Sequence, residues 1–243
     1  MANSVVHFEI STADHEALGK FYSELFGWQT QSNSDLEYTM IDTASGSGIN
    51  GGIGRADDEQ SVKFYIEVPD LKVALDKISK LGGKTVTEPT EIPAVVTFAQ
   101  FADPDGNILG LVKGGQDSPG VSPGSNPPVS WFEVLGKDAA QLQKFYSEVF
   151  GWKIKASDVD GDNYGEVEAT EGSIAGGVSA SRDGELEITL YAEVDDLKKY
   201  LDRAAELGAK TLVEPVDVDP KTSIAAFADP QGNRFGMYVR KTD

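Results

Sequence analysis

The chain has 243 residues, no cysteine and a formal net charge of −19 at pH 7. The absence of cysteine excludes disulfides, thiolate metal ligands and a cysteine nucleophile. The acidic balance argues against nucleic acid and anionic membranes as partners, because both attract clustered Lys and Arg. Hydrophobic residues make up 40% of the chain, and no stretch approaches the ~18 apolar residues of a membrane span. We therefore expect a globular cytoplasmic protein.

Two motifs occur twice. Residues 21–28 (FYSELFGW) return as residues 145–152 (FYSEVFGW) at an offset of 124, and residues 101–107 (FADPDGN) return as 227–233 (FADPQGN) at an offset of 126. Solenoid repeats are shorter, about 20–50 residues, so this period indicates two globular domains of one fold. A position that differs between the copies is not required by the fold alone.

The first copy opens with alternating residues 5–10, which predict a half-buried strand. Asp14 then supplies a helix N-cap, and Gly27 ends the predicted helix. Short strands are predicted over residues 37–42 and 49–54.

The second half of this copy repeats the pattern. Residues 63–68 predict a strand and residues 71–81 a helix, and strands over 95–101 and 108–112 follow, joined by the turn at 103–107. Each copy should therefore contain two strand–helix–strand–strand–strand units.

A segment rich in Pro and Gly, residues 115–127, separates the copies. Such a composition interrupts helices and central strands and is typical of a linker. We expect a first domain over residues 1–114 and a second over residues 128–243.

The order of these motifs resembles the vicinal oxygen chelate superfamily, which includes glyoxalase I, bleomycin resistance proteins and ring-cleaving dioxygenases. The resemblance covers residues 4–114 and 128–240. It implies an α+β fold in which each domain pairs two βαβββ modules, with curled mixed sheets around a concave cup that holds a ligand. Single-domain relatives dimerise to complete their sites, so this tandem chain is expected to be a monomer with intramolecular domain pairing or a homodimer.

Metal-dependent relatives hold a divalent ion with His, Gln or Glu side chains in the cup. The resemblance places three such positions on the strands of each copy, and His7 alone among the six residues has ligand chemistry. The middle strands, near residues 49–54 and 173–178, contain no His or Glu. We therefore expect neither a bound metal nor another cofactor. The six positions hold His7, Lys63 and Gly110 in the first copy and Trp131, Thr189 and Gly236 in the second.

Strand alternation selects the side chains that should line the cup. They combine carboxylates, phenols and an indole, which suit a small organic ligand with a cationic or hydrogen-bonding group. The glutamates occur in both copies and can equally be framework residues. His7 is also the candidate catalytic residue. The expected ligand-binding residues are His7, Glu9, Lys63, Tyr65, Trp131, Glu133, Thr189, Tyr191 and Tyr238.

Other conspicuous residues are expected to be structural. The repeated aromatic residues of the two FYSE motifs recur at helical spacing and should form core. The pairs Gly51-Gly52 and Gly176-Gly177 indicate bulges or close backbone approach. His15 follows the helix N-cap and is expected to face solvent.

Three functions follow from these residues. The first is metal-independent binding of a small organic molecule, similar to antibiotic-sequestering relatives. The second is an enzyme of lyase, isomerase or hydroxylase type, metal-free with His7 or a pocket glutamate as general base, or built around His7 and a divalent metal. The third is an interaction module without a ligand, which predicts a filled cup.

Overall fold

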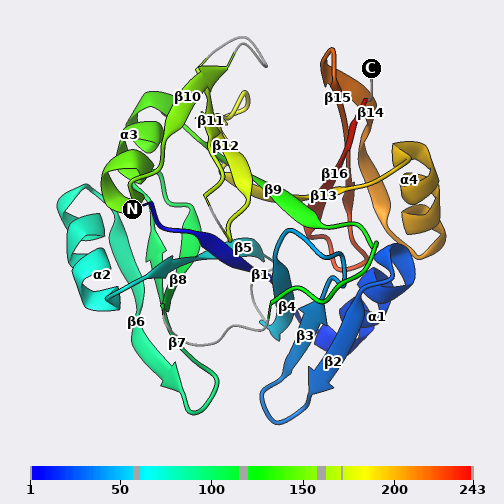
Figure 1. Cartoon of the computed structure of the whole chain (residues 1–243), viewed down its shortest axis with the longest axis horizontal. Helices are drawn as coiled ribbons and strands as arrows, with labels where there is room; N and C mark the ends of the chain where they lie inside the picture. Colours follow the sequence, from blue (N-terminus) through cyan, green and yellow to red (C-terminus); the bar gives the residue numbers. More distant parts are fainter. Residues whose placement is uncertain (1, 57–60, 115–119, 158–162, 171, 242–243) are drawn as a thin grey trace. The chain divides into compact units, whose positions relative to one another are not determined.

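The computed structural model describes residues 2–56, 61–114, 120–157, 163–170 and 172–241 (Figure 1). The first sequence copy forms two modules, each a strand, a helix and three further strands. The first module comprises β1 (Val5–Thr12), α1 (His15–Phe26), β2 (Gln29–Asn33), β3 (Tyr38–Asp42) and β4 (Asn50–Arg55). The second module comprises β5 (Ser61–Val68), α2 (Leu71–Lys80), β6 (Lys84–Ile92), β7 (Val96–Ala102) and β8 (Ile108–Lys113).

The second sequence copy repeats the same succession of elements. The third module comprises β9 (Val129–Gly136), α3 (Ala139–Phe150), β10 (Ile154–Ser157), β11 (Tyr164–Val167) and β12 (Ala175–Ala180). The fourth module comprises β13 (Glu187–Glu193), α4 (Leu197–Glu206), β14 (Lys210–Asp219), β15 (Thr222–Ala228) and β16 (Arg234–Arg240). None of the helices in the described ranges is long and apolar enough to cross a membrane.

The strands form two mixed sheets of eight strands, in the orders β2-β3-β4-β1-β5-β8-β7-β6 and β10-β11-β12-β9-β13-β16-β15-β14. The pairs β1–β4, β5–β8 and β13–β16 are parallel, whereas β2–β3, β3–β4, β6–β7 and β7–β8 are antiparallel. This architecture confirms the predicted α+β class and the repeated βαβββ module.

The sequence pattern located both helices of the first copy and most of its strands. It did not locate β2 and β6, which lie at the two edges of their sheet. Every residue of β2 is exposed, and most of β6 is as well. An edge strand without a buried face produces no apolar alternation, which is the signal used to recognise strands.

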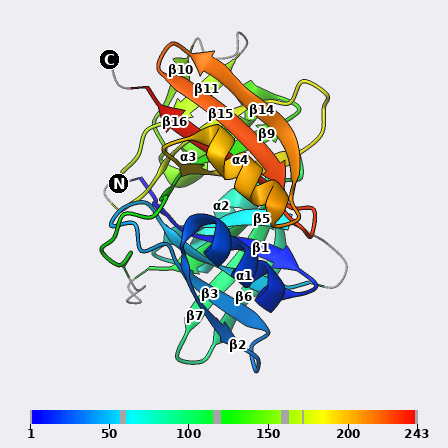
Figure 2. The ribbon, with the colours of Figure 1, turned by 90° about the vertical axis from the view of Figure 1, so that its right-hand side faces the viewer.

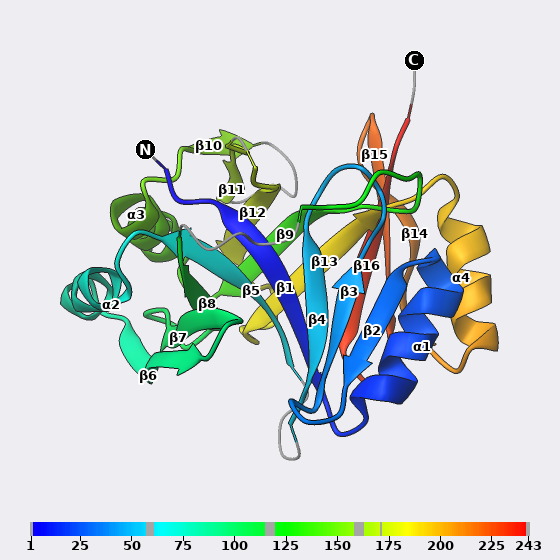
Figure 3. The same ribbon diagram turned by 60° about the horizontal axis from the view of Figure 1, so that its bottom comes forward.

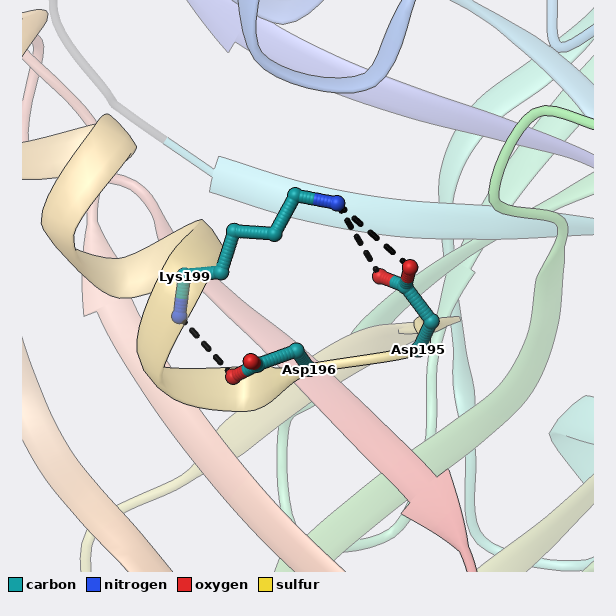
Figure 4. A network of polar contacts seen from close by, with 3 residues as sticks. All are labelled: Asp195, Asp196 and Lys199. Atoms are coloured by element: carbon teal, nitrogen blue, oxygen red, sulfur yellow. Dashed lines mark hydrogen bonds and ion pairs between the residues drawn. The ribbon is translucent and has the colours of Figure 1, made fainter.

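The helix ends follow the predicted capping chemistry. Asp14 Oδ1 accepts a hydrogen bond from Ala17 N at 3.0 Å, and Gly27 ends α1 in the left-handed conformation with φ of 77°. At the start of α4, Asp196 Oδ1 accepts from Lys199 N at 3.0 Å, while Lys199 Nζ lies 3.4 Å from the exposed Asp195 carboxylate (Figure 4). The cap fixes the helix start, and the exposed ion pair contributes little.

The chain divides into two compact units, each of which combines one module from each sequence copy. Unit 1 contains residues 1–6, 63–119 and 132–188, and unit 2 contains residues 7–62, 120–131 and 189–243. The compact units therefore cut across the sequence repeat that defines residues 1–114 and 128–243.

The described part of the linker, residues 120–127, contains no helix or strand and lies against β3 and the turn after it, within unit 2. Ser122 N donates to Asp42 Oδ1 at 3.2 Å, and Asn126 Nδ2 donates to the carbonyl of Thr43 at 3.1 Å. Residues 115–119 of the predicted linker lie outside the described ranges.

In unit 2, α1 covers one face of β2, β3 and β4, and α4 covers β14 and β15 (Figures 2 and 3). The aromatic side chains of α1, and Trp28 just after it, meet those of the fourth module beneath the helices. Phe21 and Phe227 have ring centroids 5.9 Å apart, and Trp28 and Phe235 are 6.0 Å apart. The repeated aromatics are 0–5% exposed, which confirms them as core: Phe21, Tyr22, Phe26, Trp28, Phe145, Tyr146, Phe150 and Trp152.

A buried hydrogen bond joins the two repeated motifs in each unit. Tyr22 Oη donates to Asp229 Oδ2 at 3.2 Å in unit 2, and Tyr146 Oη donates to Asp103 Oδ2 at 2.8 Å in unit 1. In both units the tyrosine comes from one sequence copy and the aspartate from the other. The motifs therefore recur because each FYSE motif has the FADP motif of the other copy as its hydrogen-bond partner.

The prediction that His15 faces solvent is wrong. His15 is 9% exposed, and its Nδ1 lies 2.8 Å from Thr39 Oγ1 of β3. The first turn of α1 packs over β3, where Thr39 supplies a buried hydroxyl. The position of His15 after the cap could not indicate this contact, because β3 lies more than twenty residues further along the chain.

We predict that the buried Tyr22 and Tyr146 make the protein less stable at alkaline pH. Burial, reinforced by the adjacent aspartate, raises the pKa of both Tyr22 and Tyr146 well above 10.0. Because the folded-state pKa is raised, the phenols stabilise the fold below about pH 10, and this contribution is lost as the pH rises further. We expect the free energy of unfolding, from urea titrations, to fall steeply above about pH 10.

The double variant Tyr22→Phe/Tyr146→Phe removes both titrating groups. Its stability at pH 7 is expected to be lower because two buried hydrogen bonds are lost, but its decline with alkaline pH should be shallower than that of the wild type. Equal slopes for the two proteins would contradict this assignment.

Candidate functional site

Each module places a tyrosine ring over a glycine of a neighbouring strand. A Cβ atom built on any of these glycines would overlap atoms of the tyrosine, so only glycine leaves the ring its space. The four pairs are Tyr38 over Gly52, Tyr65 over Gly110, Tyr164 over Gly177 and Tyr191 over Gly236.

The register of β1 and β4 assigns the faces of the first module. His7 lies opposite Asn50 and Glu9 lies opposite Gly52, so their Cα–Cβ bonds point to the same side of the sheet. Phe8 and Gly51 face the opposite side, where the Phe8 ring packs on Trp28 in the core. His7, Glu9 and the Tyr38–Gly52 pair therefore share the face turned away from the helix.

His7 is held by Tyr38 on this face. His7 Nε2 lies 2.9 Å from Tyr38 Oη, within hydrogen-bonding distance. Burial lowers the pKa of His7 below 6.5, and the negative charge of Glu9 opposes that shift in part. The imidazole is therefore neutral at physiological pH, and a neutral imidazole can accept a proton.

The corresponding face of the third module has a different partner for its tyrosine. Trp131 occupies the position of His7, and Tyr164 Oη instead donates to Glu133 Oε1 at 3.1 Å. Glu133 therefore accepts a hydrogen bond from the framework tyrosine. The sequence had left open whether this glutamate is a framework residue or a ligand-binding one.

The remaining modules place further phenols in polar contacts. In unit 1, Gln100 Nε2 donates to Tyr65 Oη at 3.5 Å. In unit 2, Tyr238 Oη donates to Glu193 Oε2 at 3.0 Å and lies 2.9 Å from Ser130 Oγ. Burial is the main cause that raises the pKa of Tyr238, so this phenol stays protonated.

The predicted site residues are divided between the two compact units. Unit 2 contains His7, Glu9, Trp131, Thr189, Tyr191 and Tyr238, and unit 1 contains Lys63, Tyr65 and Glu133. Thr189 is fully buried, and Tyr65 and Tyr191 are each 5% exposed.

Sequence reasoning missed four residues that contact the predicted ones. Two of them carried a usable signal, because Tyr38 and Tyr164 occupy equivalent positions at an offset of 126. The other two were not identifiable, since their contacts depend on the register of distant strands. The missed residues are Tyr38, Gln100, Ser130 and Tyr164.

The residues present do not fit the divalent metal that the superfamily implies. Gly110 and Gly236 stand at the last-strand ligand positions, and the rings of Tyr65 and Tyr191 fill the space of any side chain there. Within the described ranges, no cluster of three or more His, Cys, Asp or Glu is arranged to hold a metal ion.

The middle strands do not supply the missing donors. Asn50 Oδ1 accepts from Thr43 N at 2.9 Å, and its Nδ2 donates to the carbonyl of Gly120 at 3.3 Å. Ser173 Oγ accepts from Val5 N at 2.9 Å. Both side chains are engaged in holding local structure.

The chain belongs to the glyoxalase-like domain family, whose model matches it twice, over residues 7–112 and 133–237. These matches cover most of the chain and correspond to the two sequence copies. The fold is that of the vicinal oxygen chelate superfamily, as the motifs predicted.

Relatives from Mycobacterium and Streptomyces resemble nearly the whole chain. The protein named "Putative glyoxylase CFP32" of Mycobacterium tuberculosis is 25% identical over 94% of this chain and 92% of its own. The protein named "Anthracycline biosynthesis protein DauV" of Streptomyces sp. strain C5 is 24% identical over 95% of this chain and 90% of its own.

Solved structures share the fold at low identity. The Mn(II)-bound glyoxalase of Novosphingobium aromaticivorans superposes with a TM-score of 0.68 at 16% identity, over 98% of this chain and 82% of that one. The 2,3-dioxygenase LapB of Pseudomonas sp. KL28 gives 0.66 at 17% identity, over 100% of this chain and 94% of that one.

The Tyr65–Gly110 pair predicts a specific packing defect. Gly110→Ala should destabilise the protein by about 1–3 kcal/mol, because the added methyl group overlaps the Tyr65 ring. In a double-mutant cycle with Tyr65→Ala, the second substitution should recover part of that loss. Urea denaturation measures all four proteins, and additive effects would contradict the proposed clash.

We predict that His7 makes the stability of the protein sensitive to mild acid. Its folded-state pKa is depressed, so its contribution to stability is present above about pH 6.5 and is lost as the pH falls through the folded pKa. We expect Tm to fall between about pH 7.5 and about pH 5 in the wild type and to fall less in His7→Gln. Parallel pH profiles in thermal unfolding would show that His7 is not responsible.

Proposed function

We propose that this protein binds a small organic molecule, without a metal ion, on the sheet faces that carry Tyr38, Tyr65, Tyr164 and Tyr191. We call these the tyrosine-bearing faces. The observation that carries the proposal is the replacement of a possible metal ligand by a phenol ring at Gly110 and at Gly236. Where metal-dependent relatives have a carboxylate, this chain has a phenol ring, 5% exposed, beside hydrogen-bonding groups.

The chemistry of these faces supports a planar or cationic ligand. Aromatic rings stack on flat apolar molecules, and their faces attract cations. Glu9 and Glu133 add negative charge, and the net charge of −19 favours the approach of cations. The relative named for anthracycline biosynthesis makes an anthracycline a reasonable first probe.

Each compact unit already combines a module from both sequence copies. A single chain can therefore supply the module pairing that single-domain relatives obtain by dimerisation. We expect a monomer to be sufficient for binding.

An enzymatic function is the second candidate, and His7 favours it. A neutral imidazole beside Tyr38 Oη, with a carboxylate at Glu9, can accept a proton from a bound substrate. The mycobacterial relative carries a glyoxylase name. A reaction catalysed here would depend on His7, and binding alone would not.

The test measures binding of an anthracycline by fluorescence titration and calorimetry in excess EDTA. We expect saturable binding that chelation does not weaken, and a loss of about tenfold in affinity in Tyr65→Leu or Tyr191→Leu. Tyr200→Leu on α4 is the matched control, because it makes the same chemical change away from these faces. Thermal unfolding verifies that each variant is folded.

Two outcomes would count against the binding proposal. Binding that appears only after a divalent metal is added would contradict metal independence. An equal loss of affinity in all three leucine variants would show that the ligand does not bind at the tyrosine-bearing faces. Substrate turnover that His7→Gln abolishes, with affinity unchanged, would favour the enzyme.

A further inference from the structure

Unit 1 contains a groove of about 1030 Å³, and none of the tyrosines paired with glycine lines it. Pockets for small organic ligands typically measure about 300–1,000 Å³, so the groove has room for one. The groove lies where the chain enters β1 and leaves β5 and β8. The residues that line it include Asn3, Ser4, Glu67, Gly114, Lys153 and Thr170.

The Glu67 carboxylate is the main charged group at the end of β5. The backbone of Glu67 is fixed, because Asn3 Nδ2 donates to its carbonyl at 2.8 Å and its N–H donates to the carbonyl of Ser4 at 2.8 Å. Its carboxylate lies beside Gly114, where an added Cβ would be 2.6 Å from Oε1. Across the described residues, no hydrogen bond or ion pair reaches this carboxylate.

The equivalent carboxylate in unit 2 is Glu193, at an offset of 126, and it has both a phenol and a cation. Tyr238 Oη donates to Glu193 Oε2 at 3.0 Å, and Arg240 Nε lies 3.9 Å from Oε1. The Arg240 guanidinium is 5.6 Å from the centre of the Tyr238 ring. The cavity beside Glu193 measures only about 180 Å³.

The residues equivalent to Tyr238 and Arg240 in the first copy are Val112 and Gly114. The same backbone framework therefore carries its own cation in unit 2, but in unit 1 it has a glycine and an open groove. A bound molecule that carries a guanidinium or ammonium group would replace the missing Arg240.

We propose that the groove of unit 1 binds a small organic monocation, an alkylguanidinium or alkylammonium, with Glu67 as its counter-charge. The hydroxyls of Ser4 and Thr170, 3.1 Å apart, offer hydrogen bonds on the groove wall. Glu168 is paired with Lys155, which leaves Glu67 as the carboxylate available to the ligand. Lys153 on the same wall disfavours a long polycation.

The experiment titrates agmatine, an alkylguanidinium, into the full chain by isothermal calorimetry at low salt. Glu67→Gln removes the counter-charge and should weaken agmatine binding by about tenfold or more. Gly114→Arg supplies an internal cation in the manner of Arg240 and should weaken it similarly. The Glu67 carboxylate is the flexible end of a side chain, so it can move to admit the new residue, and thermal unfolding reports whether both variants fold.

Glu193→Gln is the matched control, because it removes the same charge from the equivalent position in unit 2. It should leave agmatine affinity unchanged. Any of the following overturns the proposal: no saturable agmatine binding by the wild type, unchanged affinity in Glu67→Gln, or an equal loss in Glu193→Gln, which would indicate a general effect of net charge. Displacement of agmatine by stoichiometric Mg²⁺ would identify a metal site instead.

The outcome is independent of the anthracycline titration. Tyr65→Leu and Tyr191→Leu should leave agmatine binding intact, and Gly114→Arg should leave anthracycline binding intact. Failure of one proposal is therefore distinguishable from failure of the other.

Discussion

The buried hydrogen bond from a tyrosine to an aspartate is the constraint on which the rest of this fold depends. In unit 1, Asp103 Oδ1 accepts from the backbone nitrogens of Asp105, Gly106 and Asn107 at 2.8–3.0 Å, while Oδ2 accepts from Tyr146 Oη. One carboxylate therefore closes the turn between β7 and β8 and holds α3 against it. Unpaired, these buried groups would each cost about 1–3 kcal/mol. Tyr22 and Asp229 make the same connection in unit 2.

This constraint fixes the helix-covered side of each sheet and leaves the opposite side free to diverge. The core motifs are nearly identical in the two copies, whereas His7 corresponds to Trp131, Val112 to Tyr238 and Gly114 to Arg240. Residues that hold the fold must match their partners in the other copy. Residues on the opposite side need only fit local neighbours, so the two copies differ there in charge, size and hydrogen bonding.

The pairing of tyrosine with glycine leaves no room for a side chain at Gly110 and Gly236, the two last-strand positions that the superfamily resemblance assigns to a metal ligand. A carboxylate side chain at either position would overlap the tyrosine ring unless the ring moved. The phenol rings of Tyr65 and Tyr191, each 5% exposed, occupy that space instead.

The sequence alone determined the duplication, the strands with a buried face, the helix ends and the aromatic core, because these depend on local capping and on short-range periodicity. The repeated FYSE and FADP motifs were sufficient to indicate the superfamily. Tertiary structure decided the burial of His15 by Thr39, the contact of His7 with Tyr38 and the combination of modules from both copies in each unit. It also revealed the open groove beside Glu67. These features depend on strand register and on contacts between distant segments, and a single sequence carries no local signal for either.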